Sequence, residues 1–185
     1  MKYDVTVIGS GPGGYVAAIR CAQLGLKTAI IERYNTLGGT CLNVGCIPSK
    51  ALLDSSEHFH NAKHKFDQHG IGVTGLKVNM PQMIKRKNEV VETNTKGIDF
   101  LMKKNKIDVF KGHGSFVNAN KISVAKADGT TEEIETDKTI IATGSKPIVP
   151  EAFNYDKKRI ITSTEALNID AVPKRMVIIG GGVIG

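Results

Sequence analysis

The sequence lacks the features that mark secreted, membrane-spanning or disulfide-stabilised proteins. Only three of its 185 residues are cysteines, which suits a reducing compartment, where a disulfide is more often catalytic than structural. No apolar run reaches the length of a membrane span, and Met1 to Asp4 leads straight into a strand pattern instead of a signal peptide. We therefore expect no membrane association.

Aromatic residues are also scarce, with four tyrosines and six phenylalanines, and no nucleic-acid-binding motif is present. The net charge of +7 comes from lysines that are scattered along the chain. We interpret it as a solvated surface with a general affinity for phosphates, and we expect no nucleic-acid partner. A hydrophobic content of 41% and this length allow one domain with a real core, or one domain and part of a second.

The histidines do not have the spacing of a structural metal site. Zinc in such a site takes about four ligands. The five histidines show no pair-plus-pair spacing, and they are His58, His60, His64, His69 and His113. We expect no metal, and we interpret His58, His60 and His64 as a solvated helix face.

A glycine-rich turn follows the first predicted strand. Residues 3–8 are mostly apolar and β-rich, as in a buried parallel strand, and residues 9–14 then read Gly-Ser-Gly-Pro-Gly-Gly. Residues 15–24 are alanine-rich and helical, and Gly25 is expected to stop this helix. A second strand at 27–31 ends at Glu32. In this strand–turn–helix context, G-x-G-x-x-G is the dinucleotide-binding fingerprint.

Each glycine of this fingerprint has a physical role. Gly9 permits the tight turn, Gly11 lets the backbone reach a pyrophosphate, and Gly14 lets helix and strand pack closely. The helix N-terminus supplies N–H groups and a partial positive charge, and Glu32 can accept hydrogen bonds from a ribose. A glycine-rich turn without a ligand is the alternative, which the βαβ context disfavours.

Two cysteines, Cys41 and Cys46, follow Glu32 in a stretch that also contains three glycines. They could be a metal half-site, a structural disulfide, a redox disulfide or a coincidence. Residues five apart in a regular helix have Cα atoms roughly 8.6 Å apart. A disulfide requires less than about 7 Å. If the two cysteines bond, the segment between them must be distorted, and Gly45 is where distortion is easiest.

The rest of the chain predicts an α/β protein with an inserted all-β part. Expected helices are 49–66, 81–104 (or two helices broken at Gly97) and 163–167. Expected strands are 107–110, 114–118, 121–126, 131–136, 138–143 and 175–179. The short strands form a β-meander at about 107–136, and Pro147 and Pro150 mark a linker. A second complete G-x-G-x-x-G occupies 180–185.

We therefore predict a doubly wound, three-layer, Rossmann-like parallel-sheet domain over residues 1–149. The remaining residues, 150–185, would be a linker and the first strand of a second, truncated dinucleotide-binding domain. Because the helix after the second motif is absent, we expect the chain to be an N-terminal piece of a longer protein.

Two dinucleotide motifs with a C-x4-C between them resemble the flavoprotein disulfide reductases, the class I pyridine nucleotide-disulfide oxidoreductases. The resemblance runs the whole length, through the Gly9 motif, Glu32, residues 38–50, residues 142–145 and the Gly180 motif. Within the family, Ile-Pro-Ser-Lys at 47–50 favours the members that oxidise dihydrolipoamide. Glutathione and mercuric reductases share the cysteine frame and are the nearest alternatives.

The resemblance implies roles for matching residues. Cys41 would be the interchange cysteine that a substrate thiolate attacks, Cys46 would face the flavin, and Lys50 would lie near the flavin N5 region. Cys41 and Cys46 would form a reversible disulfide, with Cys21 a buried bystander. The implied FAD- and NAD-binding residues are Gly9, Gly11, Pro12, Gly13, Gly14, Glu32, Arg33, Gly38, Gly39, Thr40, Cys41, Cys46, Lys50, His113, Gly114, Ala142, Thr143, Gly144, Ser145, Gly180, Gly182 and Gly185.

The resemblance also implies a larger assembly. The longer protein would bind FAD and NAD, form a homodimer and take dihydrolipoamide from a lipoyl domain of a 2-oxoacid dehydrogenase complex. Its location would be the bacterial cytoplasm or, as a second choice, the mitochondrial matrix. We expect the isolated chain to be inactive, to hold FAD weakly or not at all, and to self-associate through residues 175–179. A non-catalytic FAD-binding or thiol-switch module is the rival from another class.

Overall fold

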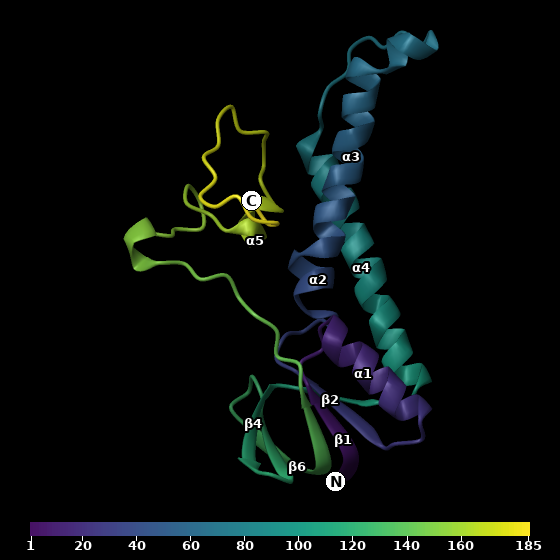
Figure 1. Cartoon of the computed structure of the whole chain (residues 1–185), viewed down its shortest axis with the longest axis vertical. Helices are drawn as coiled ribbons and strands as arrows, with labels where there is room; N and C mark the ends of the chain where they lie inside the picture. The colour runs from purple at the N-terminus through teal and green to yellow at the C-terminus, as the bar shows by residue number, and fades with distance from the viewer. The chain divides into compact units, whose positions relative to one another are not determined.

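The computed structural model describes all 185 residues and divides into two compact units (Figure 1). Unit 1 comprises residues 1–43 and 92–146, and unit 2 comprises residues 44–91 and 147–185. The predicted domain boundary at 149/150 stays a prediction. No helix is both long and apolar enough to cross a membrane.

Unit 1 is built on one six-stranded sheet. In chain order its strands are β1 (Lys2–Ile8), β2 (Thr28–Glu32), β3 (Asp108–Lys111), β4 (His113–Asn118), β5 (Lys121–Ala125) and β6 (Thr131–Ile141). Their order across the sheet is β3-β2-β1-β6-β5-β4. The first four are parallel neighbours, and β6, β5 and β4 form an antiparallel meander. The predicted parallel sheet with a β-meander is confirmed.

Strand β6 joins the two parts of the sheet. It pairs with β5 in antiparallel fashion over 131–135 and with β1 in parallel fashion over 135–141. The prediction of two strands, 131–136 and 138–143, is therefore wrong. Asp137, between the two predicted strands, lies within β6, and its carboxylate is 2.9 Å from the Lys2 ammonium on β1.

Strand β3 also differs from its predicted place. Residues 107–110 were expected to open the meander, whereas β3 pairs in parallel with β2 at the other edge of the sheet. The reason is that pairing depends on which neighbour is available in space, and a short apolar run carries no mark of its partner.

The core of unit 1 lies between β1, β2 and the meander. Its buried side chains are Tyr3, Ile8, Ala29, Ile31, Ile122, Val124 and Ile134, with Phe110 packed against them. The Tyr3 and Phe110 rings meet edge to face at 5.9 Å. The Tyr3 hydroxyl donates to Asp108 at 3.0 Å. Burial, helped by this hydrogen bond and the Asp108 charge, raises the pKa of Tyr3 to about 12. A neutral phenol thus ties β1 to β3 across the intervening strand.

Helix α1 (Pro12–Gln23) packs on β1 and β2, and α2 (Gly39–Val44) follows β2 (Figure 1). Proline at the first helical position suits the start of α1, because its missing N–H would have no intrahelical partner there. Gly25 adopts a φ of +84° just beyond the end of α1, as the glycine stop predicted.

Unit 2 contains α3 (Cys46–His64), η1 (Phe66–His69), η2 (Glu151–Phe153), α5 (Ser163–Ala166) and the first half of α4 (Met80–Lys104). Arg86 connects α4 to α3, donating to the Asp54 carboxylate at 2.6 Å and to the Ala51 carbonyl at 2.9 Å. Helix α4 is continuous, so the alternative of two helices broken at Gly97 is wrong. A glycine inside a helix lowers its stability by only about 1 kcal/mol relative to alanine, and this helix tolerates that cost. Ile98 and Met102, both buried, follow it in the same helix.

Two contacts hold the segment around α5. Thr162 and Glu165 form a capping box, which confirms the predicted helix at 163–167. The buried Lys87 ammonium donates to the Asn168 side-chain oxygen at 2.7 Å, and burial lowers the Lys87 pKa.

The predicted strand at 175–179 is not formed. These residues are exposed, and all six strands of the sheet belong to unit 1, so no strand in unit 2 is available to pair with them. A strand without a partner leaves its N–H and C=O groups to water, and nothing then favours the extended form. Residues 175–179 therefore form no exposed strand edge. Self-association of the chain through these residues stays a prediction, without the support that such an edge would give.

Candidate functional site

The first glycine turn lies at the carboxyl end of β1. Gly9 adopts a φ of +101°, and a Cβ there would overlap the carbonyl oxygen of Ala142. A Cβ at Gly14 would overlap the carbonyl oxygen of Gly9. Only glycine fits at either position, so the tight turn and the close contact between helix and strand have the cause that the sequence predicted.

The N-terminus of α1 is open beyond this turn. Gly11 is the N-cap and makes no side-chain capping bond, and the first turn contains no acidic residue. Pro12 and Gly13 are exposed, and a Cβ on Gly13 would meet no atom within 4 Å. The helix therefore presents N–H groups and its positive end to open space, which is the arrangement that binds a phosphate group.

Ser10 and Glu32 form a buried pair beside the turn. One oxygen of the Glu32 carboxylate accepts from the Ser10 hydroxyl at 2.6 Å and from the Ser10 N–H at 3.0 Å. The other accepts from the Tyr34 N–H at 2.9 Å. These bonds fix the orientation of Glu32, and a carboxylate retains further lone pairs for a ribose hydroxyl. Ser10 was not predicted as a site residue, although its place inside the G-x-G between strand and helix was the available signal.

Gly38 and Gly39 bring the cysteine-bearing segment against the glycine turn. The Gly38 N–H donates to the Ser10 carbonyl at 3.0 Å and lies 3.3 Å from the Ser10 hydroxyl. A Cβ on Gly39 would lie 2.5 Å from the Gly11 Cα, so only glycine allows the two backbones to touch. Cys41 comes two residues later, which places the first cysteine next to the nucleotide turn.

Asn43 fixes the short helix α2. Its amide nitrogen donates to the carbonyls of Leu37 at 3.0 Å and Gly39 at 2.9 Å, and its oxygen accepts from the Thr36 hydroxyl at 2.8 Å. Asn43 lies within residues 38–50, which carry the family resemblance, but no role was predicted for it. Its contacts hold the segment on which Cys41 lies.

Several other predicted site residues gather at the same edge of the sheet. Ala142 continues from β6 and donates its N–H to the Ile8 carbonyl at 2.8 Å, next to Gly9. Gly114 packs so closely on Ile8 and Ile31 that a Cβ would lie 3.3 Å from their side chains. Five further predicted site residues lie close in sequence to these contacts and are exposed, and they are Arg33, His113, Thr143, Gly144 and Ser145.

Positive charge lies beside Tyr34 at this edge. The Arg33 guanidinium lies 4.9 Å from the Tyr34 ring centroid and the Lys146 ammonium 5.9 Å from it. Both cations are exposed, and they favour a negatively charged ligand at the carboxyl ends of the strands. Arg33 was predicted as a site residue, whereas Tyr34 and Lys146 were not.

The two cysteines lie on either side of an interruption in the helical path. Helix α2 ends at Val44, Gly45 has φ −139° and ψ −115°, and α3 begins at Cys46. The distortion falls where the sequence predicted it. Cys41 is half-buried and Cys46 is exposed as a free thiol, so the disulfide between them stays a prediction. Cys21 is half-buried in α1, not buried as expected.

Lys50 is exposed on α3, four residues after Cys46. This spacing places both side chains on one face of the helix. Cys46 is the first residue of a 19-residue helix, where N–H groups and the helix dipole favour a negative charge such as a thiolate.

The second glycine motif, in unit 2, repeats the turn of the first. Gly180 adopts a φ of +101°, the same value as Gly9. A Cβ at Gly185 would overlap the carbonyl oxygen of Gly180, as one at Gly14 would overlap that of Gly9. Gly182 lies between them and is exposed. The turn therefore closes in the same way at both motifs.

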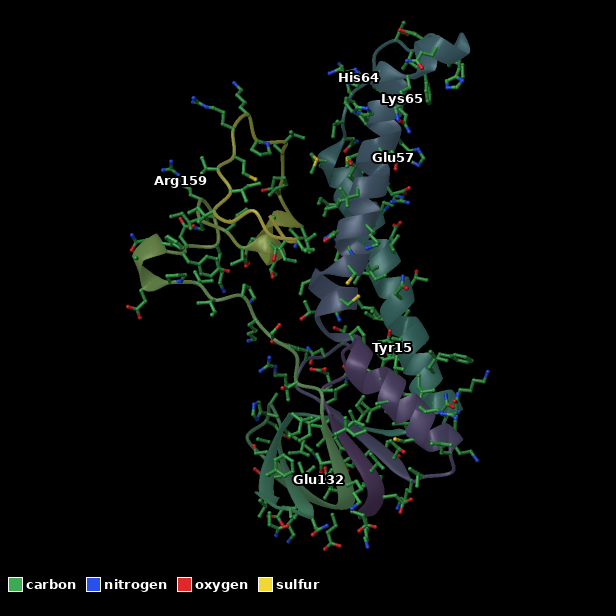
Figure 2. All side chains as sticks on the ribbon, viewed as in Figure 1. Tyr15, Glu57, His64, Lys65, Glu132 and Arg159 are labelled. Carbon is green, nitrogen blue, oxygen red and sulfur yellow. The ribbon has the colours of Figure 1, made fainter.

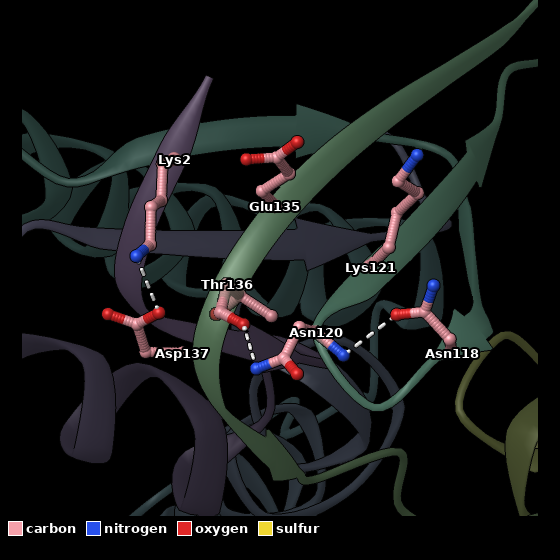
Figure 3. Close-up of a pocket in the computed structure, with 7 residues that line it drawn as sticks. All are labelled: Lys2, Asn118, Asn120, Lys121, Glu135, Thr136 and Asp137. Carbon is pink, nitrogen blue, oxygen red and sulfur yellow. Dashed lines mark hydrogen bonds and ion pairs between the residues drawn. The ribbon is translucent and has the colours of Figure 1, made fainter.

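A shallow polar pocket of about 300 Å³ lies elsewhere in unit 1 (Figure 3). It is lined by Lys2, Asn118, Asn120, Lys121, Glu135, Thr136 and Asp137. It includes the start of β1, at the other end of that strand from Gly9. Its two ammonium groups are matched by two carboxylates, and Figure 3 shows the Lys2–Asp137 ion pair. It is not part of the nucleotide edge.

The described residues define a nucleotide-binding redox protein, with two dinucleotide turns and a cysteine pair that follows the first. Comparison with known proteins agrees. The pyridine nucleotide-disulphide oxidoreductase family matches residues 3–185, and the chain belongs to this family. Membership of this family implies a flavin and a pyridine nucleotide as cofactors.

Similar proteins are known from several organisms. The chain is 52% identical over 185 residues to the mitochondrial dihydrolipoyl dehydrogenase of Schizosaccharomyces pombe, covering 100% of this chain and 36% of that protein. It is 51% identical over 182 residues to the leghemoglobin reductase of Vigna unguiculata, covering 98% and 35%. The crystal structure of LpdA from Mycobacterium tuberculosis matches with a TM-score of 0.83 at 25% identity, covering 94% and 38%. The chain thus spans about a third of the length of the curated relatives it matches.

Proposed function

We propose that this chain forms the FAD-binding and redox-disulfide part of a dihydrolipoamide dehydrogenase. The observation that carries the proposal is the contact between the first glycine turn and the segment that leads to Cys41. Gly39 packs backbone to backbone on Gly11, and Gly38 bonds to Ser10. A cysteine at position 41 is therefore held beside a turn built to bind a dinucleotide. This arrangement serves electron transfer between a disulfide and a bound nucleotide cofactor.

The glycine turn fits FAD. The open N-terminus of α1 at Pro12 and Gly13 would hold the pyrophosphate, and Glu32, oriented by Ser10, would accept hydrogen bonds from the adenosine ribose. Arg33 would add positive charge next to the phosphates. When bound, FAD supplies a two-electron acceptor for the reduced cysteine pair.

The protein's own chemistry is thiol–disulfide exchange. A dihydrolipoamide thiolate would attack the Cys41 sulfur of an oxidised Cys41–Cys46 pair, forming a mixed disulfide and releasing Cys46 as a thiolate. The second thiol of the substrate, after losing its proton, would then attack the mixed disulfide and release Cys41. Dihydrolipoamide is thereby oxidised to lipoamide, and both cysteines are reduced. The N-terminus of α3 and Lys50 would favour the negative charge on Cys46.

The substrate and partners follow from the resemblance and the relatives. Ile-Pro-Ser-Lys at 47–50 and the 52% identity to a dihydrolipoyl dehydrogenase support dihydrolipoamide. In the full-length protein the electrons would pass to NAD⁺, for which the Gly180 turn is the first element of a site. Homodimerisation and a lipoyl domain as the substrate carrier belong to the same proposal, with a location in the bacterial cytoplasm or the mitochondrial matrix.

The test uses the full-length protein. We expect flavin absorbance in the purified protein, NADH formation from NAD⁺ with dihydrolipoamide, and at least about 100-fold less activity with reduced glutathione. Cys41→Ser and Cys46→Ser should each abolish turnover, while Cys21→Ser should not. Equal rates with glutathione would reassign the substrate. A flavin-free protein, or activity that survives Cys46→Ser, would overturn the proposal.

A further inference from the structure

Four of the five histidines lie within twelve residues, between His58 and His69, and the proposed redox function uses none of them. Two of these, His60 and His64, are both exposed on α3. Their spacing of four residues puts them on the same face of the helix, one turn apart. Their ring centroids lie 4.8 Å apart with an angle of 42° between the ring planes.

This separation can be compared with the geometry of a bound metal ion. A histidine nitrogen binds zinc at about 2.0–2.1 Å, and the ring centre lies roughly 1.2 Å further along, about 3.2 Å from the metal. Two such rings would have centroids about 4.5 Å apart at a bond angle of 90° and about 5.2 Å apart at a tetrahedral angle. The 4.8 Å between His60 and His64 lies between these values.

The electrostatic surroundings are mixed. His64 is the last residue of α3, where the negative end of the helix dipole favours a cation. Glu57 lies three residues before His60 and seven before His64, a spacing that places all three on the same side of α3. Figure 2 labels Glu57 and His64 on this helix. Lys63 and Lys65 flank His64 and oppose a cation, but exposed charges are screened by salt.

We propose that His60 and His64 form a surface site for a divalent transition-metal ion that prefers imidazole, such as Ni²⁺, Cu²⁺ or Zn²⁺. Water would fill the remaining coordination positions, because no group of three or more His, Cys, Asp or Glu side chains is arranged to hold a metal. The site differs from the four-ligand zinc site that the sequence argues against. Binding would also link the last two turns of α3.

His58 supplies the matched control. It lies on the same helix and is also exposed, but its ring nitrogen lies 3.7 Å from the Asp54 carboxylate, and it is two residues from His60. Residues two apart do not share a helix face. His58→Gln therefore removes an imidazole of the same cluster without touching the proposed pair.

The experiment is a titration of the protein with NiCl₂, followed by calorimetry and by paramagnetic broadening of backbone amide signals. We expect broadening centred on residues 57–67. His60→Gln and His64→Gln should each weaken Ni²⁺ binding by about tenfold or more, because the remaining imidazole binds without its chelate partner. His58→Gln should change it less than about twofold. Circular dichroism would verify that each variant keeps its helix content. No broadening around His60 up to millimolar Ni²⁺, or an equal loss in His58→Gln, would overturn the proposal.

Discussion

Replacing Ser10 by alanine tests how the nucleotide edge is held together. Ser10 is fully buried, and its hydroxyl donates to the Glu32 carboxylate at 2.6 Å. Ser10→Ala removes this donor and leaves a buried carboxylate oxygen with only the Ser10 N–H. A hydrogen bond to a charged group contributes about 1.5–3 kcal/mol. The contact with Gly38 adds little, because its N–H keeps the Ser10 carbonyl at 3.0 Å.

We therefore expect Ser10→Ala to lower the free energy of unfolding by about 1.5–3 kcal/mol. For a chain of this size that corresponds to a fall in melting temperature of about 3–12 °C. Urea unfolding should show a lower midpoint with an unchanged slope, since the surface exposed on unfolding stays the same.

Ser115→Ala is the matched control, because Ser115 is exposed on β4 and lies outside the cluster. It should change the free energy of unfolding by less than about 0.5 kcal/mol. A loss of similar size in both variants, or a loss below about 0.5 kcal/mol for Ser10→Ala, would show that Glu32 finds other partners and that Ser10 does not orient it.

Three further predictions concern other parts of the chain. Peptide mapping before and after reduction should find a reversible bridge between Cys41 and Cys46; a bridge to the third cysteine, or stoichiometric zinc, would contradict this. Burial opposes the charge on Glu165, but hydrogen bonds from Tyr155 and Thr162 outweigh it and lower its pKa to about 2. The α5 segment should therefore lose stability as the pH falls from about 4.5, the ordinary pKa of a glutamate, to about 2. Glu165→Gln should remove this pH dependence in amide-exchange measurements. An unchanged pH dependence in the variant would mean that other carboxylates cause it. Lys87→Met should leave the free energy of unfolding within about 1 kcal/mol of the parent or raise it, since it replaces a buried charge without an acidic partner; a large loss in urea unfolding would mean that the bond to Asn168 outweighs the burial of the charge.

The sequence predicted best the features that depend on a few adjacent residues. The strand at 3–8, the glycine turn and the stop at Gly25 are confirmed because each depends on backbone freedom or hydrophobicity within one short window. The break at Gly45 belongs to the same class. Ser10 and Asn43 escaped notice because their importance depends on partners brought close by folding, which no local pattern records.

Strand pairing also depends on partners in space, which adjacent residues do not specify. β3 was assigned to the wrong part of the sheet, and β6 was divided at Asp137, because the sequence does not say which strand will lie alongside. Register and partner follow from the packing of the whole sheet on its core.

The segment that ends in the second glycine motif contains one feature that adjacent residues determine and one that depends on partners in space. At Gly180 the turn has the backbone angle of Gly9 and closes on Gly185 in the same way, yet the strand expected just before it is not formed. Turn closure is therefore a property of the glycines themselves, whereas β1 (Lys2–Ile8) exists because β2 and β6 pair with it on both sides. A G-x-G-x-x-G sequence therefore specifies the shape of a turn that can receive a phosphate. Only a paired sheet and a following helix can hold that turn in place and direct N–H groups toward the ligand. In this chain the motif at Gly9 meets both conditions, which supports the proposal that FAD binds there.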